Sequence, residues 1–585
     1  MIGKKRLFYL LFVLILIGCK RSETSASTPY NPPLTKVSLT TDKARYNPGD
    51  IVQFAVDKEL PSTAKIRYRH LNKVIREEDF SGKSWQWTVP GNDFTGYMVD
   101  IYETVDGKEA VLGSIGVDVS SDWSRFPRYG FLSKYSQMSN SAVNAVVKKL
   151  NRDHINGIQF YDCEFKHHLP LAGTTTNPDT VWTDIAGRDI YMSTLKKYLN
   201  TVHNYNMVAM FYNLAYGALS GARADGVSDQ WYLYTDRSHG TKDKFALPNP
   251  PFKSNIWLLD PSNAGWQQYI ANKTEDFFKV FDFDGYHIDQ LGNRDKNLYT
   301  YDGVSVNLPT TFESFIQSMH AAMPEKRLVM NAVNQYGQSE IANSPVDFLY
   351  TEVWTPNNTY ADLASIIKDN FSRSNGKKSS VLAAYMDSNL TSSKGFFNTP
   401  GVLLTDAVIF AFGGAHIELG EHMLSQPYFP NDDLQIKGDL RDALVKYYDF
   451  LVAYENLLRD GGIFNNPDIS SLDNNLRLNN WPPQRGSVAV IGKETGNRQV
   501  IHLLNFLDAT TLNWRDASGT QPYPRVIKDW RLQIGTTKAV KEVWYASPDY
   551  RYGSSVSLPF TQSGAALTFT LPEMQYWGMI ILEYK

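Results

Sequence analysis

The chain has 585 residues and a formal net charge of −3, and its composition, 42% hydrophobic and 20% charged, is typical of a globular protein too long for one hydrophobic core. The near-neutral balance argues against nucleic acid as a partner, because phosphate contacts need a surplus of Lys and Arg. Aromatic residues make up 13% of the chain, which suits either stacking on sugar rings or packing in a β-rich protein.

The first residues are typical of an export signal. A basic patch at residues 4–6 precedes an apolar run, 7–17, that is shorter than the ~20 residues of a membrane-spanning helix. Leu16-Ile17-Gly18-Cys19 resembles the lipobox of bacterial lipoproteins, whose cysteine is lipidated; the alternative is an ordinary signal peptide with a chance cysteine. We predict a signal peptide over 1–18, lipidation at Cys19, a tether over 19–33, and an exported protein anchored to a bacterial membrane, the outer membrane in particular.

Only one other cysteine, Cys163, is present. With Cys19 lipidated, Cys163 has no partner for an intramolecular disulfide. Two cysteines also cannot form a cysteine-based zinc site. We therefore expect stability to come from the size of the core, and we expect neither a metal nor another cofactor.

Residues 34–121 alternate apolar and polar side chains with a period of two. Val52, Phe54 and Val56 illustrate the pattern, and turn sequences such as Asn47-Pro48-Gly49-Asp50 separate the runs. Short strands at this spacing predict an immunoglobulin-like β-sandwich.

Residues 122–481 instead alternate short apolar strands with helical stretches, which favours a central (β/α)8 TIM barrel. The eighth strand is either Tyr129–Leu132 or a stretch near Ile256–Leu259. A helix over Leu440–Leu458 would close the barrel. The predicted helices are Ser141–Asn151, Met192–Tyr205, Ala264–Phe281 and Thr311–Ala322. The other predicted strands are Ile155–Tyr161, Met207–Tyr212, Asp284–Asp289, Arg327–Ala332, Asp347–Glu352, Val381–Met386 and Val408–His416.

Period-two alternation returns over residues 482–585. Val488 and Val490 illustrate it, and the chain nearly ends on a fully apolar stretch, Met579–Leu582, which we expect to be a buried strand. This segment predicts a C-terminal Greek-key β-sandwich. The predicted fold is therefore multidomain, α/β plus all-β.

The strand ending at Asp289 carries the strongest candidate for chemistry. In an eight-stranded barrel, active residues come from the carboxyl ends of strands. Because side chains alternate along a strand, His287 and Asp289 share one face while Tyr286 and Ile288 share the other. The apolar pair suits the helix side, which would direct Asp289 toward the barrel mouth. An equally good alternative at this point is that Asp289 caps the following helix.

Glu352 ends another apolar strand and lies close in sequence to Trp354, a candidate sugar platform. A carboxyl group against an aromatic face can acquire the raised pKa of a general acid. The alternative is a surface glutamate after a short strand. Two carboxyl groups at nearby strand ends are the minimum requirement for glycosidic hydrolysis.

A third polar cluster follows the strand at Ile155–Tyr161. It contains Asp162, Glu164, His167 and His168. Metal binding is one interpretation, but adjacent histidines on an extended chain point to opposite sides, so hydrogen bonding to sugar hydroxyl groups is favoured. Other polar groups at strand ends either bind substrate or pair with one another inside the protein. These are Tyr212, Asn213, Asp260, Asn331, Asp387, His416, Glu418, Glu421 and His422.

Several strings together resemble glycoside hydrolase family 66, which contains endo-dextranases and cycloisomaltooligosaccharide glucanotransferases. The resemblance covers the whole ordered chain, because those enzymes also place a barrel between two β-domains. The strings are Gln159-Phe160-Tyr161-Asp162, His167-His168-Leu169-Pro170, Tyr212-Asn213-Leu214-Ala215-Tyr216, Asp284-Gly285-Tyr286-His287-Ile288-Asp289 and His416-Ile417-Glu418-Leu419-Gly420-Glu421.

The resemblance implies a retaining hydrolase in which Asp289 is the nucleophile and Glu352 the acid/base. It further implies a separation of about 5–5.5 Å between the two carboxyl groups, the retaining distance. The implied partner is an α-1,6-glucan (dextran) with its isomaltooligosaccharide products, and we expect a monomer. Taking strand-end position and these strings together, we predict as substrate-binding residues Asp162, His167, His168, Tyr212, Asn213, Tyr216, Asp260, His287, Gln290, Trp354, Asp387, His416 and Glu418.

The chain departs from the family pattern at Cys163, where an aromatic residue is expected, so a packing contact near the substrate would differ. The cyclising enzymes carry an extra carbohydrate-binding module in the barrel region. No insertion of that size, ~100 residues, interrupts the pattern here, which favours hydrolysis. The alternatives are a cyclising glucanotransferase and a non-catalytic glycan-binding surface lipoprotein; paired Asp289 and Glu352 favour an enzyme over a binder.

Overall fold

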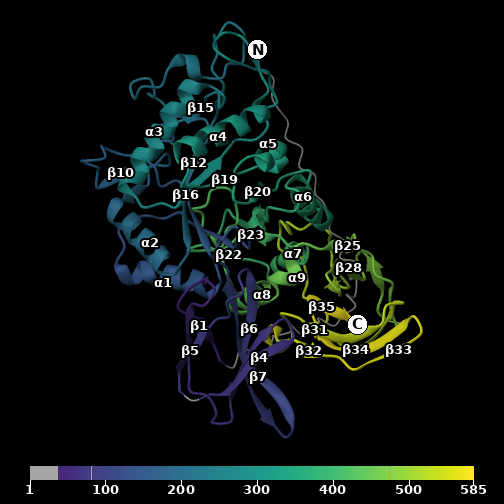
Figure 1. Cartoon of the computed structure of the whole chain (residues 1–585). Coiled ribbons are helices and arrows are strands. Elements are labelled where there is room, and N and C mark those ends of the chain that lie inside the picture. Colours follow the sequence, from purple (N-terminus) through teal and green to yellow (C-terminus); the bar gives the residue numbers. More distant parts are fainter. Residues whose placement is uncertain (1–36, 81, 474) are drawn as a thin grey trace, which may run out of the picture.

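The computed structural model describes residues 37–80, 82–473 and 475–585 (Figure 1). The predicted signal peptide, the lipidation site Cys19 and the tether lie outside these residues. Within them, no helix combines the length and apolarity needed to cross a bilayer.

The N-terminal part consists of two antiparallel sheets around one core (purple in Figure 1). Along β2, Val52, Phe54 and Val56 are buried while their neighbours are exposed, as the alternation predicts. These side chains share a core with Val99 and Ile115 of the other sheet. The first sheet contains β1 (Leu39–Thr41), β2 (Ile51–Val56) and β5 (Ser84–Thr88); the second contains β4 (Lys73–Asp79), β3 (Lys65–His70), β6 (Thr95–Val105) and β7 (Lys108–Val119).

The central part is a closed ring of eight parallel strands. Each strand pairs in parallel with the next one along the chain, and the fifth and sixth strands are joined by the single bridge Asn331–Tyr350. The parallel bridge between Phe131 of the first strand and Gly420, after the last, closes the ring. Strand order around the ring equals chain order. The strands are β8 (Tyr129–Leu132), β9 (Gly157–Phe160), β12 (Val208–Leu214), β16 (Gly285–Asp289), β19 (Arg327–Met330), β20 (Leu349–Glu352), β21 (Ser380–Ala383) and β23 (Ala415–His416).

Helices follow the strands of the ring in alternation and cover its outside. α1 begins at the N-cap Ser139, and α6 begins with a capping box between Thr359 and Asp362, so both starts are fixed by local side chains. The helices are α1 (Asn140–Arg152), α2 (Met192–Asn204), α3 (Ala264–Val280), α4 (Phe312–Ala322), α5 (Gln338–Asn343), α6 (Tyr360–Arg373), α7 (Thr399–Ala411), α8 (Gly438–Ala453) and α9 (Glu455–Leu458).

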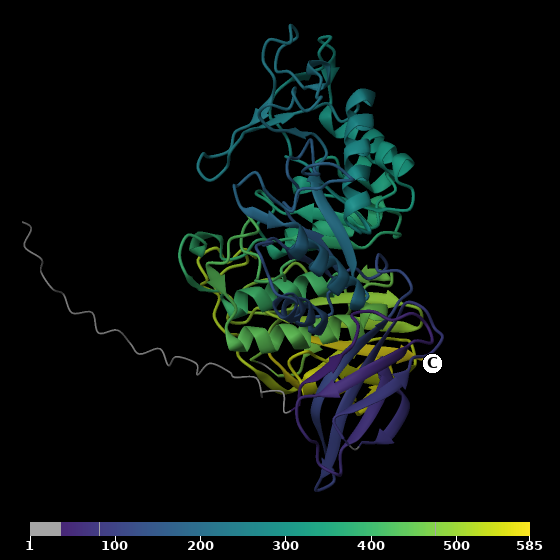
Figure 2. The same ribbon diagram turned by 90° about the vertical axis from the view of Figure 1, so that its left-hand side faces the viewer.

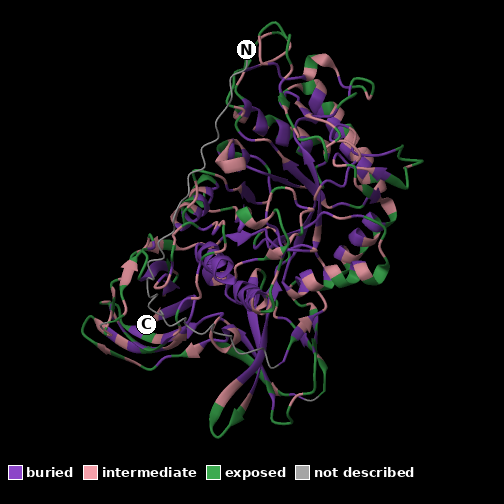
Figure 3. Ribbon diagram, turned by 180° about the vertical axis from the view of Figure 1, so that it is seen from behind, coloured by how far each residue is buried: buried purple, intermediate pink, exposed green. Residues whose placement is uncertain are grey.

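The alternation of side chains along the ring strands separates two cores. Tyr286 and Ile288 belong to the large core that contains the helices. His287, between them, faces the interior, where its ring stacks on Tyr129 and meets Tyr350 edge-on. The predicted alternation, with Tyr286 and Ile288 toward the helices and His287 on the opposite face, is therefore confirmed. Buried residues concentrate in the central strands and helices, while exposed residues gather on loops and outer helix faces (Figure 3).

Two sequence predictions require correction. The predicted strand Val408–His416 is mostly helix, because α7 extends to Ala411 and only Ala415–His416 form β23. All residues of α7 are buried, so its apolar run shows no periodicity that distinguishes a buried helix from a strand. The stretch near Ile256 is β15 (Ile256–Leu258), which pairs antiparallel outside the ring, so Tyr129–Leu132 is the eighth ring strand.

The loops after the ring strands carry small two- and three-stranded sheets. The small strands are β10 (Val181–Thr183), β11 (Asp189–Tyr191), β13 (Gly217–Ala218), β14 (Lys244–Phe245), β15, β17 (Leu298–Tyr299), β18 (Ser305–Val306), β22 (Gly395–Phe396) and β24 (Leu434–Gln435). The teal loops around β15 project from one end of the molecule, whereas β10 lies at its side and β22 near its middle (Figure 1).

The C-terminal part again contains two sheets around a core. The predicted buried strand Met579–Leu582 lies in β35, between β29 and β31. Strands over 463–480 precede the predicted boundary at 482 but pair with these sheets. One sheet holds β25 (Ile463–Asn465), β27 (Leu478–Asn480), β28 (Val488–Thr495), β29 (Arg498–Asn505), β35 (Trp577–Tyr584), β31 (Val540–Ala546) and β32 (Val556–Ser557); the other holds β26 (Ile469–Ser471), β30 (Ile527–Gly535), β34 (Ala566–Met574) and β33 (Phe560–Ser563).

The N- and C-terminal sheets both lie at the end of the molecule opposite the projecting loops (Figures 1 and 2). α8 packs against β6 and β7. Two glycines permit the close approach, since a Cβ on Gly96 would overlap the carbonyl oxygen of Val452 and one on Gly116 would lie 2.7 Å from that of Asp449.

We predict that Gly96→Ala lowers the free energy of unfolding by about 2 kcal/mol, because backbone must shift to admit the methyl group. Thermal unfolding of the variant checks this. Gly91→Ala is the matched control, because a Cβ at Gly91 meets nothing within 4 Å. Equal midpoints for the two variants would contradict the tight contact.

Candidate active site

A cavity of about 500 Å³ opens at the carboxyl ends of the ring strands. Its walls come from the ends of six ring strands and the loops after them, as expected for a site at this end of such a ring. The lining residues are Gln159, Tyr161, Asp162, His167, Ile185, Tyr212, Leu214, Phe245, Leu247, Phe252, Ile256, His287, Asp289, Gln290, Leu291, Asn331, Val333, Tyr350, Glu352, Trp354, Tyr385, Pro427, Tyr428 and Phe429.

Asp289 and Glu352 face the cavity and are connected by one amide group. Asn331 Nδ2 donates to Asp289 Oδ1 at 2.8 Å and to Glu352 Oε2 at 3.1 Å. The other oxygen of each acid accepts from a tyrosine: Tyr212 donates to Asp289 Oδ2 at 2.6 Å, and Tyr385 donates to Glu352 Oε1 at 2.9 Å. All four carboxylate oxygens therefore have a donor that fixes their direction.

Asp289 raises the proton affinity of Glu352. Burial and the charge of Asp289 together raise the pKa of Glu352 to about 7. Burial also raises the pKa of Asp289, while the hydrogen bonds from Tyr212 and Asn331 oppose that rise. Because aspartate starts from the lower ordinary pKa, the pair keeps its negative charge on Asp289 and its proton on Glu352 near neutral pH.

His287 lies beneath this pair and is neutral. Burial lowers its pKa to about 3, and its Nδ1 lies 3.2 Å from the hydroxyl oxygen of Tyr129. Its ring is held among the rings of Tyr129, Tyr212 and Tyr350. A neutral imidazole adds no charge under the carboxylates, so it supports them by packing.

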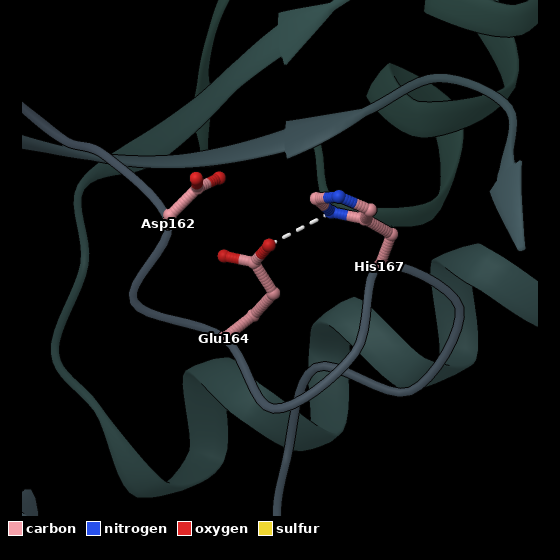
Figure 4. A group of neighbouring side chains, drawn as sticks. All are labelled: Asp162, Glu164 and His167. Carbon is pink, nitrogen blue, oxygen red and sulfur yellow. Dashed lines mark ion pairs between the residues drawn. The ribbon is translucent and has the colours of Figure 1, made fainter. Parts of the chain in front are cut away.

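Asp162, Glu164 and His167 form a second polar group in the loop after β9 (Figure 4). Asp162 and His167 line the cavity, and Glu164 lies between them in the figure and is buried. His167 Nδ1 lies 2.7 Å from Glu164 Oε1 and 3.0 Å from Asn213 Oδ1. Although burial opposes it, this contact with Glu164 raises the pKa of His167, which favours a cationic ring beside the acids.

Two groups of residues have the spacing to hold a metal ion: Asp162, Glu164 and His167, and the group Asp406, His416 and Glu418. In each group the histidine Nδ1 already lies within 3 Å of a carboxylate oxygen. In the first group, His167 Nδ1 lies within hydrogen-bond distance of both Glu164 Oε1, at 2.7 Å, and Asn213 Oδ1, at 3.0 Å. The first group is therefore better suited to hydrogen bonding than to metal binding.

Aromatic rings form much of the cavity wall. Tyr161 lies between Tyr212, at 4.8 Å, and Phe429, at 4.3 Å between ring centroids. Trp354 and Tyr385 are 5.5 Å apart beside Glu352. Flat apolar walls with polar tips suit the faces and hydroxyl groups of a sugar ring.

The structure brings together eight of the predicted site residues at this cavity and places the other seven elsewhere. Those at the cavity are Asp162, His167, Tyr212, His287, Asp289, Gln290, Glu352 and Trp354. Those that do not line it are His168, Asn213, Tyr216, Asp260, Asp387, His416 and Glu418.

Each of these seven has a partner inside the protein. Asn213 orients His167, and Tyr216 accepts a hydrogen bond from the Leu291 amide. His168 Nε2 lies 2.9 Å from Asp225, and Asp260 accepts from Ser262. Asp387 accepts from the Asn398 amide. His416 contacts Asp406 and Ala384 O, while Glu418 accepts from Tyr448. Cys163 is buried in the outer core, away from the cavity.

The cavity also contains Tyr385, Tyr161 and Gln159, which were not among the predicted site residues, and Asn331, which was predicted as a polar group at a strand end without being assigned to binding. Asn331 directly follows β19, so its position at a strand end is a signal that the sequence does contain. Tyr385 lies just beyond the end of β21, and it faces the ring interior like Val381 and Ala383, which precede it at every second position. Tyr161 and Gln159 lie in the first family motif but were not selected from it.

Arg515, from the C-terminal part, reaches the loop after β20. Its guanidinium lies 4.3 Å from the ring of Trp514 and 5.5 Å from that of Trp354. Arg515 Nη2 donates to the Val353 carbonyl at 2.5 Å. Burial lowers the pKa of Arg515, while the charges of Tyr385 and Glu352 oppose the shift. Nothing in the local sequence pattern links this residue to Glu352, 163 positions earlier.

Comparison with known proteins gives one family. The model described as "Glycosyl hydrolase family 66" matches residues 41–581. A cycloisomaltooligosaccharide glucanotransferase of Niallia circulans is 28% identical and covers 93% of this chain and 72% of its own. A dextranase of Streptococcus salivarius is 25% identical, covering 89% and 73%. The structure of a Paenibacillus sp. cycloisomaltooligosaccharide glucanotransferase complexed with cycloisomaltoheptaose has a TM-score of 0.85 at 24% identity, covering 93% of this chain and 99% of that one.

We predict that Glu352→Gln stabilises the protein at pH 8 and not at pH 4. The folded-state pKa of Glu352, about 7, lies above its ordinary value of 4.5, so ionisation costs folding free energy as pH rises from 4.5 through 7. Removing the charge restores ~1–3 kcal/mol above that range. Thermal midpoints at both pH values check this, with the exposed Glu325→Gln as control. An equal shift at both pH values would indicate a packing effect instead.

Proposed function

The chain belongs to glycosyl hydrolase family 66 and is a glycoside hydrolase, and from this we propose that it hydrolyses internal α-1,6-glucosidic bonds of dextran with retention of configuration, releasing isomaltooligosaccharides. The single observation that carries the proposal is the half-buried pair Asp289 and Glu352, which lines the cavity and is held by Asn331. We interpret the ring as a (β/α)8 TIM barrel, flanked by an immunoglobulin-like and a Greek-key β-sandwich.

The reaction would proceed in two displacements. In the first, a carboxylate oxygen of Asp289 attacks the anomeric carbon, the glycosidic C–O bond breaks, and Glu352 gives its proton to the departing oxygen. In the second, ionised Glu352 takes a proton from water, and the water oxygen displaces Asp289 from the same carbon. The raised pKa of Glu352, about 7, suits both roles near neutral pH.

The geometry of Asn331 supports retention. Since one nitrogen contacts Asp289 Oδ1 at 2.8 Å and Glu352 Oε2 at 3.1 Å, these oxygens lie within about 6 Å of each other, short of the ~6.5–9.5 Å of inverting enzymes. At this spacing no water molecule fits between Asp289 and the anomeric carbon, so Asp289 itself would attack the sugar. Tyr212 and Tyr385 would hold the two carboxylates in line.

Substrate contacts would come from the cavity walls. Asp162 and cationic His167 offer an acceptor and a donor for sugar hydroxyl groups, and Gln290 offers both. Trp354 and Tyr161 would provide stacking faces. The dextran class of substrate is supported by the relatives named dextranase and cycloisomaltooligosaccharide glucanotransferase.

Cyclisation is the second candidate, favoured by the glucanotransferase relative at 28% identity. Both reactions begin with the same covalent intermediate and differ in whether water or the chain's own far end accepts the sugar. We favour hydrolysis because the described loops between ring strands contain only short sheets and no inserted domain. We further propose export and lipid anchoring at Cys19, supported by residues 4–19.

We predict that Asp289→Asn and Glu352→Gln each reduce reducing-sugar release from dextran at least ~10³-fold, because each removes a group that forms or breaks a bond. Reducing-sugar release is the measurement, and product chromatography separates linear oligosaccharides from rings. Asp406→Asn is the control, a buried acid outside the cavity. Near-wild-type turnover in either variant would remove that residue from the mechanism; cyclic products would select the second candidate.

We predict that Arg515→Gln lowers kcat/KM on dextran roughly tenfold, because the loop carrying Trp354 loses its brace. Loss of a cation near Glu352 should also raise the pKa of Glu352 and so shift the alkaline limb of the pH–activity profile to higher pH. Arg525→Gln, an exposed arginine of the same segment paired with Asp508, is the control. An unchanged pH profile with reduced stability would assign Arg515 a structural role only.

A further inference from the structure

A second cavity, of about 340 Å³, lies at the opposite end of the ring. Arg125 precedes β8, Ser380 begins β21, and Gly413 precedes β23, so all three mark the amino ends of ring strands. The C-terminal sheets contribute Phe464 of β25 and Lys493 of β28 to the same cavity. It is therefore separate from the site around Asp289 and Glu352.

The lining of this cavity is strongly basic. It includes six basic side chains and no aspartate or glutamate. Among the described residues, only Arg125 of the six has a salt bridge, to Asp460. The six are Arg125, Lys368, Lys377, Lys378, Arg459 and Lys493.

The more buried cations of this lining are satisfied by neutral groups instead of by acids. Lys493 Nζ donates to the Leu458 carbonyl at 3.0 Å, and Lys378 Nζ donates to two carbonyls, at 2.9 and 2.5 Å. Arg459 Nη2 donates to the Pro127 carbonyl at 2.9 Å, while its buried Nε and Nη1 have no hydrogen-bond partner in the described structure. Their hydrogen bonds leave the positive charge uncompensated.

Burial lowers the pKa of Lys493 and of Lys378 to about 8. It also lowers the pKa of Arg459 to about 9, despite the nearby acids Glu455 and Asp118. The lowered pKa values mean that the nearby acids do not offset the cost of burying these charges, and the cavity lining itself provides no counter-charge. An anion in the cavity would supply one.

Large apolar side chains lie beside the exposed lysines at the rim of the cavity. Phe371 is 42% exposed and Ile463 is 76% exposed, and both line the cavity. Deeper, Phe412 and Phe464 contact each other at 5.2 Å between ring centroids. Exposed large side chains beside a basic cavity favour a ligand that is charged at one end and apolar at the other.

We propose that this cavity binds a phosphate ester with an apolar body, its phosphate near Lys493, Lys368 and Lys377 and its apolar part against Phe371 and Ile463. The cluster of cations favours an oxyanion, and lysine binds phosphate as a point charge. Inorganic phosphate has the charge without the apolar body, so as a probe it separates the two contributions.

The test uses calorimetric titration of the full chain at constant ionic strength with three probes: inorganic phosphate, monomeric dihexanoylphosphatidylglycerol, and dihexanoylphosphatidylcholine. We expect the phosphatidylglycerol to bind at least tenfold more tightly than either other probe. Equal affinity for the two lipids would overturn the charge argument. If inorganic phosphate bound as tightly as the anionic lipid, the proposed apolar contact would be wrong. If none of the three probes bound, the cavity would not be a binding site.

Variants locate the binding. Lys493→Met and the exposed Lys368→Glu should each weaken phosphatidylglycerol binding at least tenfold, and Ile463→Ser should weaken lipid binding while leaving phosphate binding unchanged. Lys528→Met, an exposed lysine of the C-terminal part, is the control. Because Lys493 is buried, Lys368→Glu keeps the test valid if Lys493→Met unfolds. Dextran hydrolysis should be unchanged in all of them, and wild-type affinity in Lys368→Glu would overturn the placement.

Discussion

Two half-buried acids side by side set the central constraint of this molecule. Asp289 and Glu352 would repel each other if both were ionised, and in a desolvated site that repulsion is only weakly screened. Asn331 stands between them and donates to both. The arrangement requires three consecutive ring strands, because Asp289 ends β16, Asn331 follows β19 and Glu352 ends β20. Neighbouring strands lie ~4.8 Å apart, so the middle strand is the one place from which a short amide reaches both acids.

The rest of the structure keeps that geometry from relaxing. Inside the ring, His287 is neutral and packed among tyrosines, so no mobile charge lies beneath the acids. Tyr212 and Tyr385 fix the outer carboxylate oxygens. Beyond the ring, Trp514 Nε1 donates to the Asn357 carbonyl and Arg515 to that of Val353. A loop of the C-terminal part thus braces the segment that follows Glu352, which gives this part a role in the site as well as in the core.

The sequence predicted what depends on local periodicity and could not predict what depends on partners distant in the chain. The alternation of side chains directed Asp289 correctly, since Tyr286 and Ile288 pack in the core that contains the helices and leave His287 and Asp289 on the opposite face. The same strand-end rule also selected His416, Glu418 and Asp387, which pair with Asp406, Tyr448 and the Asn398 amide. Position at a strand end does not reveal whether another segment supplies a partner. Arg515 could not be predicted because it lies at no strand end and reaches the site from a distant segment of the chain. Helix α7 was predicted as a strand because a helix buried on all sides shows no periodic pattern.

Compensation of buried charge separates structural groups from sites. Asp449 pairs with Arg152 and His154, and its pKa is lowered although it is fully buried. Glu352 is half-buried and Lys493 is buried, and the pKa values of both shift toward the neutral form. Asp289 adds a like charge beside Glu352, and the charge of Asp460 does not offset the cost of burying Lys493. Shifted pKa alone is not sufficient, since Asp406, raised to about 8, lies beside Glu418 outside either cavity. A buried charge without full compensation marks a candidate site where it also borders a cavity that a ligand can enter. Only there can a bound ligand stabilise the charge and so lower the free energy of the folded state. Both ends of the ring meet that condition, one with acids and the other with bases.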